Sequence, residues 1–136
     1  MRLLTVLLFL AMLSLPLTRV VADDPKEVAI AHMVYFKLKE ATPEAKQKLI
    51  DGCKKYLSEH EGTLFFAVGI RGVEYKRDVN DKDWDVGLHI VFTNKSAHDK
   101  YQDHPDHTKF RDASKDLIDK VRVYDTVYTP ITKSRK

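Results

Sequence analysis

Three segments of the chain alternate like β-strands but carry apolar residues on both faces. They span residues 28–38, 63–72 and 84–93 and are rich in β-branched and aromatic side chains. In the first segment one face carries His32, Val34, Phe36 and Leu38, and the other carries Met33 and Tyr35. An apolar sheet face of this size is not left in water, so the predicted sheet needs a cover on both sides.

Two helical regions are available as one of these covers. The first is expected to begin after the N-cap Thr42 and to end at Gly62, a residue type favoured just beyond a helix. The second consists of a short helix over 95–103 and a further helix from Pro105 to about Lys120. The break is predicted because proline disfavours helical geometry in the residue before it.

A last strand over residues 121–129 completes the order β-α-β-β-α-β. This is an α+β fold of the split βαβ type, for which we expect a mixed sheet with both helical regions on one face. The other face then has no cover within the chain. A second copy of the sheet, paired by symmetry, is the simplest cover, so the pattern predicts a homodimer.

The N-terminus has the composition of a secretory signal peptide. Arg2 is followed by an apolar run over residues 3–15, and small residues precede a predicted cleavage site after Ala22. The run is shorter than the ~20 residues that span a bilayer. We therefore expect residues 1–22 to be removed and the protein to be secreted or periplasmic, free of the membrane. An uncleaved anchor is the alternative, and Arg19 close to the cleavage site favours it.

The remaining chain is predicted to be one domain over residues 23–130 with a basic tail at 131–136. Removing residues 1–22 takes two of the 23 basic residues and none of the 20 acidic ones, which leaves a net charge of +1. Apart from the short tail, the sequence has no stripe of lysine and arginine, so nucleic acid is not an expected partner. The single cysteine, Cys53, excludes an internal disulfide, and its apolar neighbours at helical spacing indicate a buried residue.

The densest group of polar side chains lies around the helix break, at residues 101–107. His104 is the expected N-cap of the second helix, and His107 falls in its first turn, where the helix dipole favours a neutral imidazole. A neutral imidazole is suited to act as a general base near pH 7, and Tyr101 could polarise a carbonyl nearby. The alternative is purely structural: His104 caps the helix, Tyr101 packs in the core and His107 bonds backbone.

These residues resemble a known family. The segment AHMVYFKLK at 31–39, Trp84-Asp85 ahead of a strand that ends at Phe92, and YQDHPDH at 101–107 are similar to the stress-responsive A/B barrel (Dabb) domain. The resemblance covers residues 30 to 129. It implies a ferredoxin-like α+β fold whose dimer forms a barrel.

One branch of that family, the plant polyketide cyclases that make olivetolic acid, implies a cofactor-free reaction. By this resemblance His107 is the base, Tyr101 binds the carbonyl oxygen, and His32 is a further pocket residue. The chain departs from the branch at Val86, where the cyclases have a pocket histidine, and an exported protein has no evident supply of a thioester-bound polyketide. The ligand pocket is expected to include Val34, Phe36, Val86 and His104.

Three classes of function remain open at this point. The first is a dimeric barrel that binds a small apolar or aromatic ligand without catalysis, and the second is a cofactor-independent lyase or cyclase that uses the same pocket. The third is haem or metal binding by histidines. Because no two of the six histidines are spaced as His-x-x-x-His, the sequence predicts neither a metal site nor a cofactor. We favour the first class, because a fold alone does not specify a reaction.

Overall fold

The computed structural model describes residues 28–128. The predicted signal peptide, the predicted basic tail and the ends of the proposed domain, at 23–27 and 129–130, lie outside these residues. Among the helices described, none is long and apolar enough to cross a membrane.

Four strands and three helices follow one another along the described chain. Their bounds are β1 Ile30–Leu38, α1 Pro43–Leu57, β2 Thr63–Ile70, β3 Val86–Phe92, α2 Lys95–Gln102, α3 Pro105–Ser114 and β4 Ile118–Val127. The predicted order of strands and helical regions is confirmed, with the second helical region split into α2 and α3 at Pro105.

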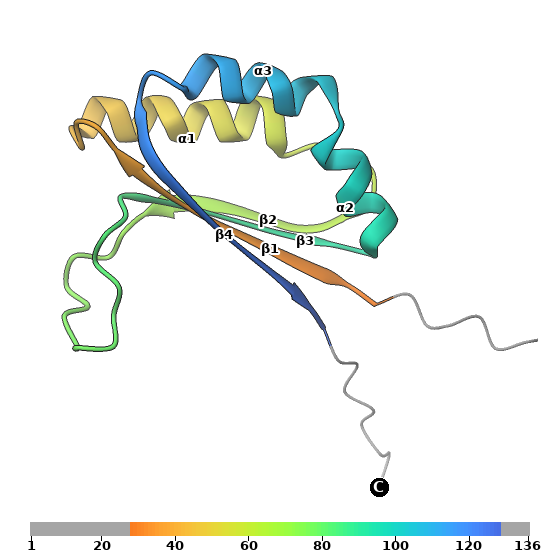
Figure 1. Ribbon diagram of the computed structural model, residues 1–136, viewed down its shortest axis with the longest axis horizontal. Helices are drawn as coiled ribbons and strands as arrows, with labels where there is room; N and C mark the ends of the chain where they lie inside the picture. The colour runs from red at the N-terminus through yellow and green to blue at the C-terminus, as the bar shows by residue number, and fades with distance from the viewer. Residues whose placement is uncertain (1–27, 129–136) are drawn as a thin grey trace, which may run out of the picture.

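The strands form a single sheet in the order β2-β3-β1-β4, and every neighbouring pair is antiparallel. The expectation of a mixed sheet was therefore wrong. β3 lies between β1 and β2, so these two strands of the βαβ unit never pair with each other. The helices all lie on one side of the sheet (Figure 1).

Two predicted helix ends were also wrong. Thr42 caps α1 by accepting a hydrogen bond from the Ala45 amide, as its sequence indicates, but α1 ends at Leu57. Gly62 lies in the turn before β2, where its φ of 81° suits glycine. α3 ends at Ser114 instead of about Lys120, because the chain from Ile118 onward pairs with the end of β1.

The core lies between the sheet and the helices. The side chains of β1 and β3 that face the helices are almost fully buried and pack against α1 and α3. Cys53 of α1 is part of this core, as predicted, and burial raises the pKa of its thiol to about 12. The thiol is therefore protonated and unreactive at neutral pH.

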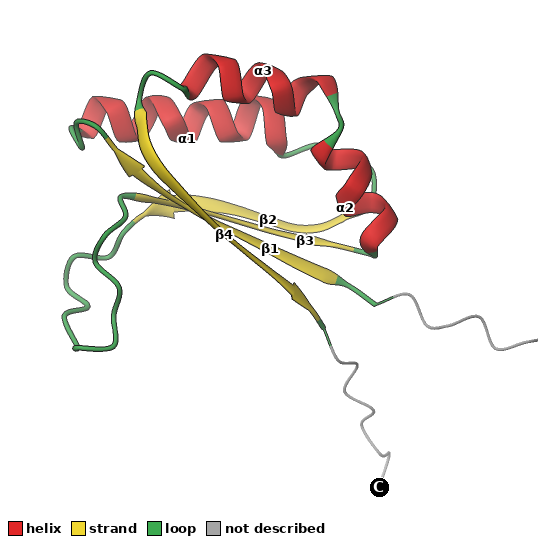
Figure 2. Cartoon of the chain, viewed as in Figure 1, coloured by secondary structure: helices red, strands yellow, loops and turns green. Residues whose placement is uncertain are grey.

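No helix of the described chain covers the opposite face of the sheet, and only the end of the segment between β2 and β3 lies against it. Tyr35 of β1 lies at its centre, with the Trp84 and Tyr124 rings 4.9 and 6.0 Å away between centroids. Phe65 and Tyr124 are each more than half exposed. The segment between β2 and β3 extends away from the helices at one end of the sheet (Figure 2). The strands thus have two apolar faces, of which the helices cover one.

Candidate functional site

A cavity of about 570 Å³ lies between the helix-facing side of the sheet and helices α2 and α3. Its walls are mainly apolar and include Val34, Phe36, Leu88 and Phe110. Its polar lining comes from three elements and the end of the last: His32 from β1, Tyr101 and Gln102 from α2, His107, Arg111 and Ser114 from α3, and Lys115 at the C-terminal cap of α3. An apolar enclosure with a few convergent polar groups is the usual form of a small-molecule site.

The structure brings together five of the seven residues named from the sequence. His32, Tyr101, His107, Val34 and Phe36 all line this cavity. The expectation that Val86 and His104 also line it was wrong. Val86 is fully buried in the core, opposite Phe36 in the β1–β3 register and away from the cavity.

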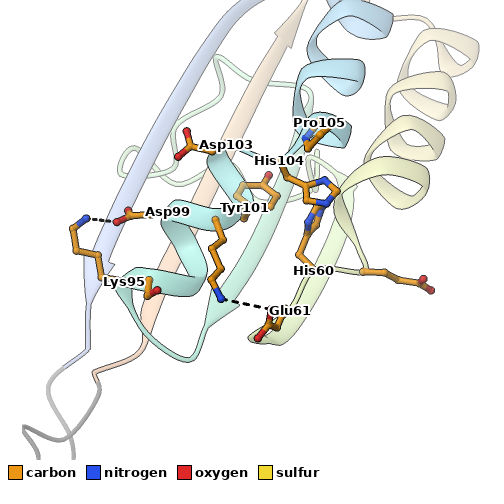
Figure 3. A pocket seen from close by; sticks show the side chains of 11 residues that line it. His60, Glu61, Lys95, Asp99, Tyr101, Asp103, His104 and Pro105 are labelled. Carbon is orange, nitrogen blue, oxygen red and sulfur yellow. Dashed lines mark hydrogen bonds and ion pairs between the residues drawn. The ribbon is translucent and has the colours of Figure 1, made fainter.

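His104 belongs to a second, polar hollow of about 800 Å³ on the outer side of α2 (Figure 3). It caps α3, its Nδ1 accepting a hydrogen bond from the Asp106 amide, and its ring lies 4.7 Å from that of His60. Glu61, Lys95 and Asp99 also line this hollow, and Tyr101 separates it from the apolar cavity. Its charged walls suit solvent better than an apolar ligand.

His107 is placed by the helix break. Pro105 starts α3, so His107 falls in the first turn with its ring centroid 5.0 Å from that of Tyr101. Nδ1 of His107 is buried and has no hydrogen-bond partner within residues 28–128. Burial lowers the pKa of His107, and electrostatic interaction with Arg111 and with His32 lowers it further. A hydrogen bond to the Gln102 backbone acts in the opposite direction and raises the pKa. The sequence had suggested the helix dipole as the cause; in the structure, burial is the largest of the causes named here.

Tyr101 is the most enclosed polar residue of the cavity, with 2% of its surface exposed. Its ring meets those of His32 and His60 edge-on, at 5.6 and 5.0 Å between centroids. Burial raises the pKa of its hydroxyl, so Tyr101 keeps its proton and can donate a hydrogen bond into the cavity.

His32 forms a pair with a residue that sequence reasoning missed. Its Nδ1 lies 2.6 Å from Oδ1 of Asp125, and because a carboxylate only accepts, Nδ1 donates. Burial lowers the pKa of His32, although Asp125 acts in the opposite direction. The ring of His98 lies 5.2 Å from that of His32. Asp125 is far away in sequence, and only the β1–β4 register places it opposite His32.

Solved structures with the same fold come from several organisms. A Dabb family protein with a ferredoxin-like fold from Mesorhizobium loti is 30% identical, with a TM-score of 0.61 over 78% of this chain and 100% of that one. A dimeric ferredoxin-like protein of unknown function from Thermobifida fusca is 16% identical, with a TM-score of 0.62 over 76% and 93%. A hydroxynitrile lyase from Passiflora edulis is 12% identical, with a TM-score of 0.63 over 80% and 100%.

The Thermobifida and Passiflora proteins are so distant in sequence that their similarity to this chain shows the fold alone. No functionally curated protein matches the sequence significantly. The family itself is clear, because residues 30–128 match the Stress Responsive A/B Barrel Domain (Dabb). The match runs from the first residue of β1 to just past the end of β4. The ferredoxin-like fold and the family predicted from sequence are thus confirmed, and the chain belongs to the stress-responsive A/B barrel family.

Proposed function

We propose that this protein is a homodimer in which each subunit binds a small apolar or aromatic molecule in the cavity between sheet and helices. The observation that carries the ligand proposal is the cavity itself: about 570 Å³ in volume, with largely apolar walls and the Tyr101 and His107 side chains at its lining. Small-molecule sites fall in the range of roughly 300–1,000 Å³.

The homodimer proposal depends on the uncovered sheet face. Tyr35, Phe65 and Tyr124 offer an aromatic surface that the helices do not cover. The Thermobifida protein of the same fold is described as dimeric. A symmetric pairing of the two sheets buries this face in both copies at once.

The polar groups of the cavity indicate a ligand with a carbonyl or hydroxyl group. Tyr101 is a donor at neutral pH, and a neutral His107 offers an acceptor nitrogen. The exposed Arg111 and Lys115 also line the cavity and would tolerate a negatively charged substituent pointing outward. We therefore propose a flat, mostly apolar molecule with one oxygen at the Tyr101 end.

Acetophenone is a suitable first probe for this site. We expect acetophenone to shift the NMR signals of Tyr101 and His107. Val121 is a half-exposed residue of the cavity wall, so Val121→Trp should fill the cavity and abolish the shift. Val127→Trp, on the same strand but outside the wall, is the matched control and should bind normally. Equal binding by both variants would place the ligand elsewhere.

Catalysis is the second candidate function, favoured by the place of His107 beside Tyr101 in the cavity lining and by the burial that lowers the pKa of His107. In this proposal His107 removes a proton from the carbon next to a ligand carbonyl, and the Tyr101 hydroxyl donates to the oxygen on which the negative charge develops. The proton then returns from His107 to the product. The reaction is a lyase, isomerase or cyclase step in which no electrons leave the substrate.

The protonation state of His107 tests this second candidate. Because burial disfavours its charged form, we expect its pKa to lie below the ~6.5 of a free histidine. NMR titration of the imidazole signals measures it, with His107→Gln identifying the resonance. The pKa of His107 is lower in the folded protein than in the unfolded chain. The stability that this residue contributes to the folded protein is therefore lost as the pH falls below ~6.5 toward the folded pKa. A pKa well above neutral pH would leave His107 protonated and exclude the role of general base.

We further propose that the domain acts outside the cytosol, because residues 1–22 have the pattern of a signal peptide with cleavage after Ala22.

A further inference from the structure

We propose that His32, His98 and Asp125 form a binding site for one divalent transition-metal ion of the zinc type. One donor atom from each of these residues lies within 4.8 Å of the other two. Asp125 is central to the group, 2.6 Å from His32 Nδ1 and 3.6 Å from His98 Nε2. This is a feature beyond the proposed ligand cavity, whose lining includes His32 but neither His98 nor Asp125.

The three donors come from three elements that the fold holds in place. His32 on β1 and Asp125 on β4 are direct partners in the antiparallel register, so their side chains lie on the same face of the sheet. That face is the one covered by helices, and α2 carries His98 to it. The positions of the donors are therefore fixed by strand pairing and helix packing, which lowers the cost of assembling the site.

A second group of contacts orients His98 as a metal ligand. Its Nδ1 lies 3.5 Å from Oδ1 of Asp99, and its Nε2 lies 3.2 Å from the side-chain nitrogen of Gln102. An amide nitrogen donates, so Nε2 of His98 accepts with the lone pair that the ion would take over from the Gln102 amide, while Nδ1 holds the proton toward Asp99. A carboxylate on the far nitrogen of a histidine is the usual support of a metal ligand.

The donor set determines the class of ion. Two imidazoles and one carboxylate suit Zn²⁺ and similar transition metals, whereas Mg²⁺ and Ca²⁺ prefer oxygen ligands. Zinc–ligand bonds of ~2.0–2.2 Å place tetrahedral donors about 3.4 Å apart, so a small rotation of Asp125 and His98 closes the site. Asp125 is about half exposed and free to make that adjustment. The ion replaces the proton between His32 and Asp125, and the proton is released to solvent.

The site has an open side. His32 is buried and His98 nearly so, but the exposed half of Asp125 leads to solvent. Three protein ligands with a fourth position open to water is the arrangement of catalytic zinc sites, in contrast to the closed four-ligand sites on which folding depends. We therefore expect reversible binding by the folded protein rather than a metal that is required for folding.

The test is a Zn²⁺ titration of the full chain, purified without a histidine tag. Calorimetry should give one ion per chain, and NMR should show that the His32 and His98 ring signals move first. His98→Gln and Asp125→Asn should each weaken binding more than about tenfold, and Asp99→Asn should weaken it about tenfold. His60→Gln is the matched control, because His60 lies outside the group and contacts the Tyr56 carbonyl instead.

Folding of each variant is checked by its melting temperature without zinc, since zinc should raise that temperature only where the site is intact. The proposal is overturned if no stoichiometric binding occurs, or if His98→Gln and Asp125→Asn bind zinc as the unaltered protein does. Either result leaves the ligand proposal standing, because Tyr101 and His107 are not donors in this group.

Discussion

Replacing Tyr35 by aspartate should convert the proposed dimer into a monomer. Tyr35 lies at the centre of the uncovered sheet face, in contact with the Trp84 and Tyr124 rings. A carboxylate there lies beside Arg122, its partner in the β1–β4 register, but that guanidinium already pairs with Asp81 and Asp83. Burying it costs more than about 3 kcal/mol, or about a hundredfold or more in the dissociation constant. Light scattering at micromolar concentration measures the mass directly.

The control keeps the charge and changes its location. Thr108→Asp places a carboxylate on the exposed surface of α3, in the helical layer on the other side of the sheet, and should remain a dimer. Circular dichroism must show that Tyr35→Asp is folded, since an unfolded variant would also lose the dimer. A folded Tyr35→Asp chain that is still dimeric would mean that the subunits associate through another surface.

The arrangement of elements could be predicted from sequence because the apolar pattern has a clear period. β1 and β3 alternate strongly, and the Thr42 cap and Pro105 break are local signals with a known physical cause. The wrong predictions concern features that long-range contacts determine. The end of α3 depends on pairing of Ile118 with Leu38, and the neighbours of each strand depend on the whole topology.

The candidate site was predictable to the same extent. Strand alternation placed His32 on one face with Val34 and Phe36, and the helix break placed Tyr101 and His107 near one another. Alternation does not say which face the helices cover, and that was settled by the structure. The partners of His32 were missed because Asp125 and His98 meet it only through register and helix packing, which leave no local pattern.

The cavity and the core share a wall, and one residue of that wall should have a large effect on stability. Phe110 of α3 is 4% exposed, lines the cavity, and lies 6.0 Å from the Phe36 ring between centroids. It also packs closely over Gly52 of α1. Phe110→Ala should therefore lower the free energy of unfolding by about 3–5 kcal/mol. Urea unfolding at one fixed protein concentration measures the change, because the stability of a dimer depends on concentration.

Leu64→Ala is the matched truncation, since Leu64 is largely exposed on β2 and its loss should change stability by less than about 0.5 kcal/mol. The void left by Phe110→Ala opens into the existing cavity, so a small apolar molecule such as toluene should bind there and restore part of the lost stability by mass action. The unaltered protein should be stabilised less by toluene, because the Phe110 ring already fills that part of the space. If Phe110→Ala costs no more than Leu64→Ala, the wall between helix and sheet does not hold the core together. If it is destabilised as expected but gains nothing from toluene, the core collapses into the space, and the cavity is not a preformed site.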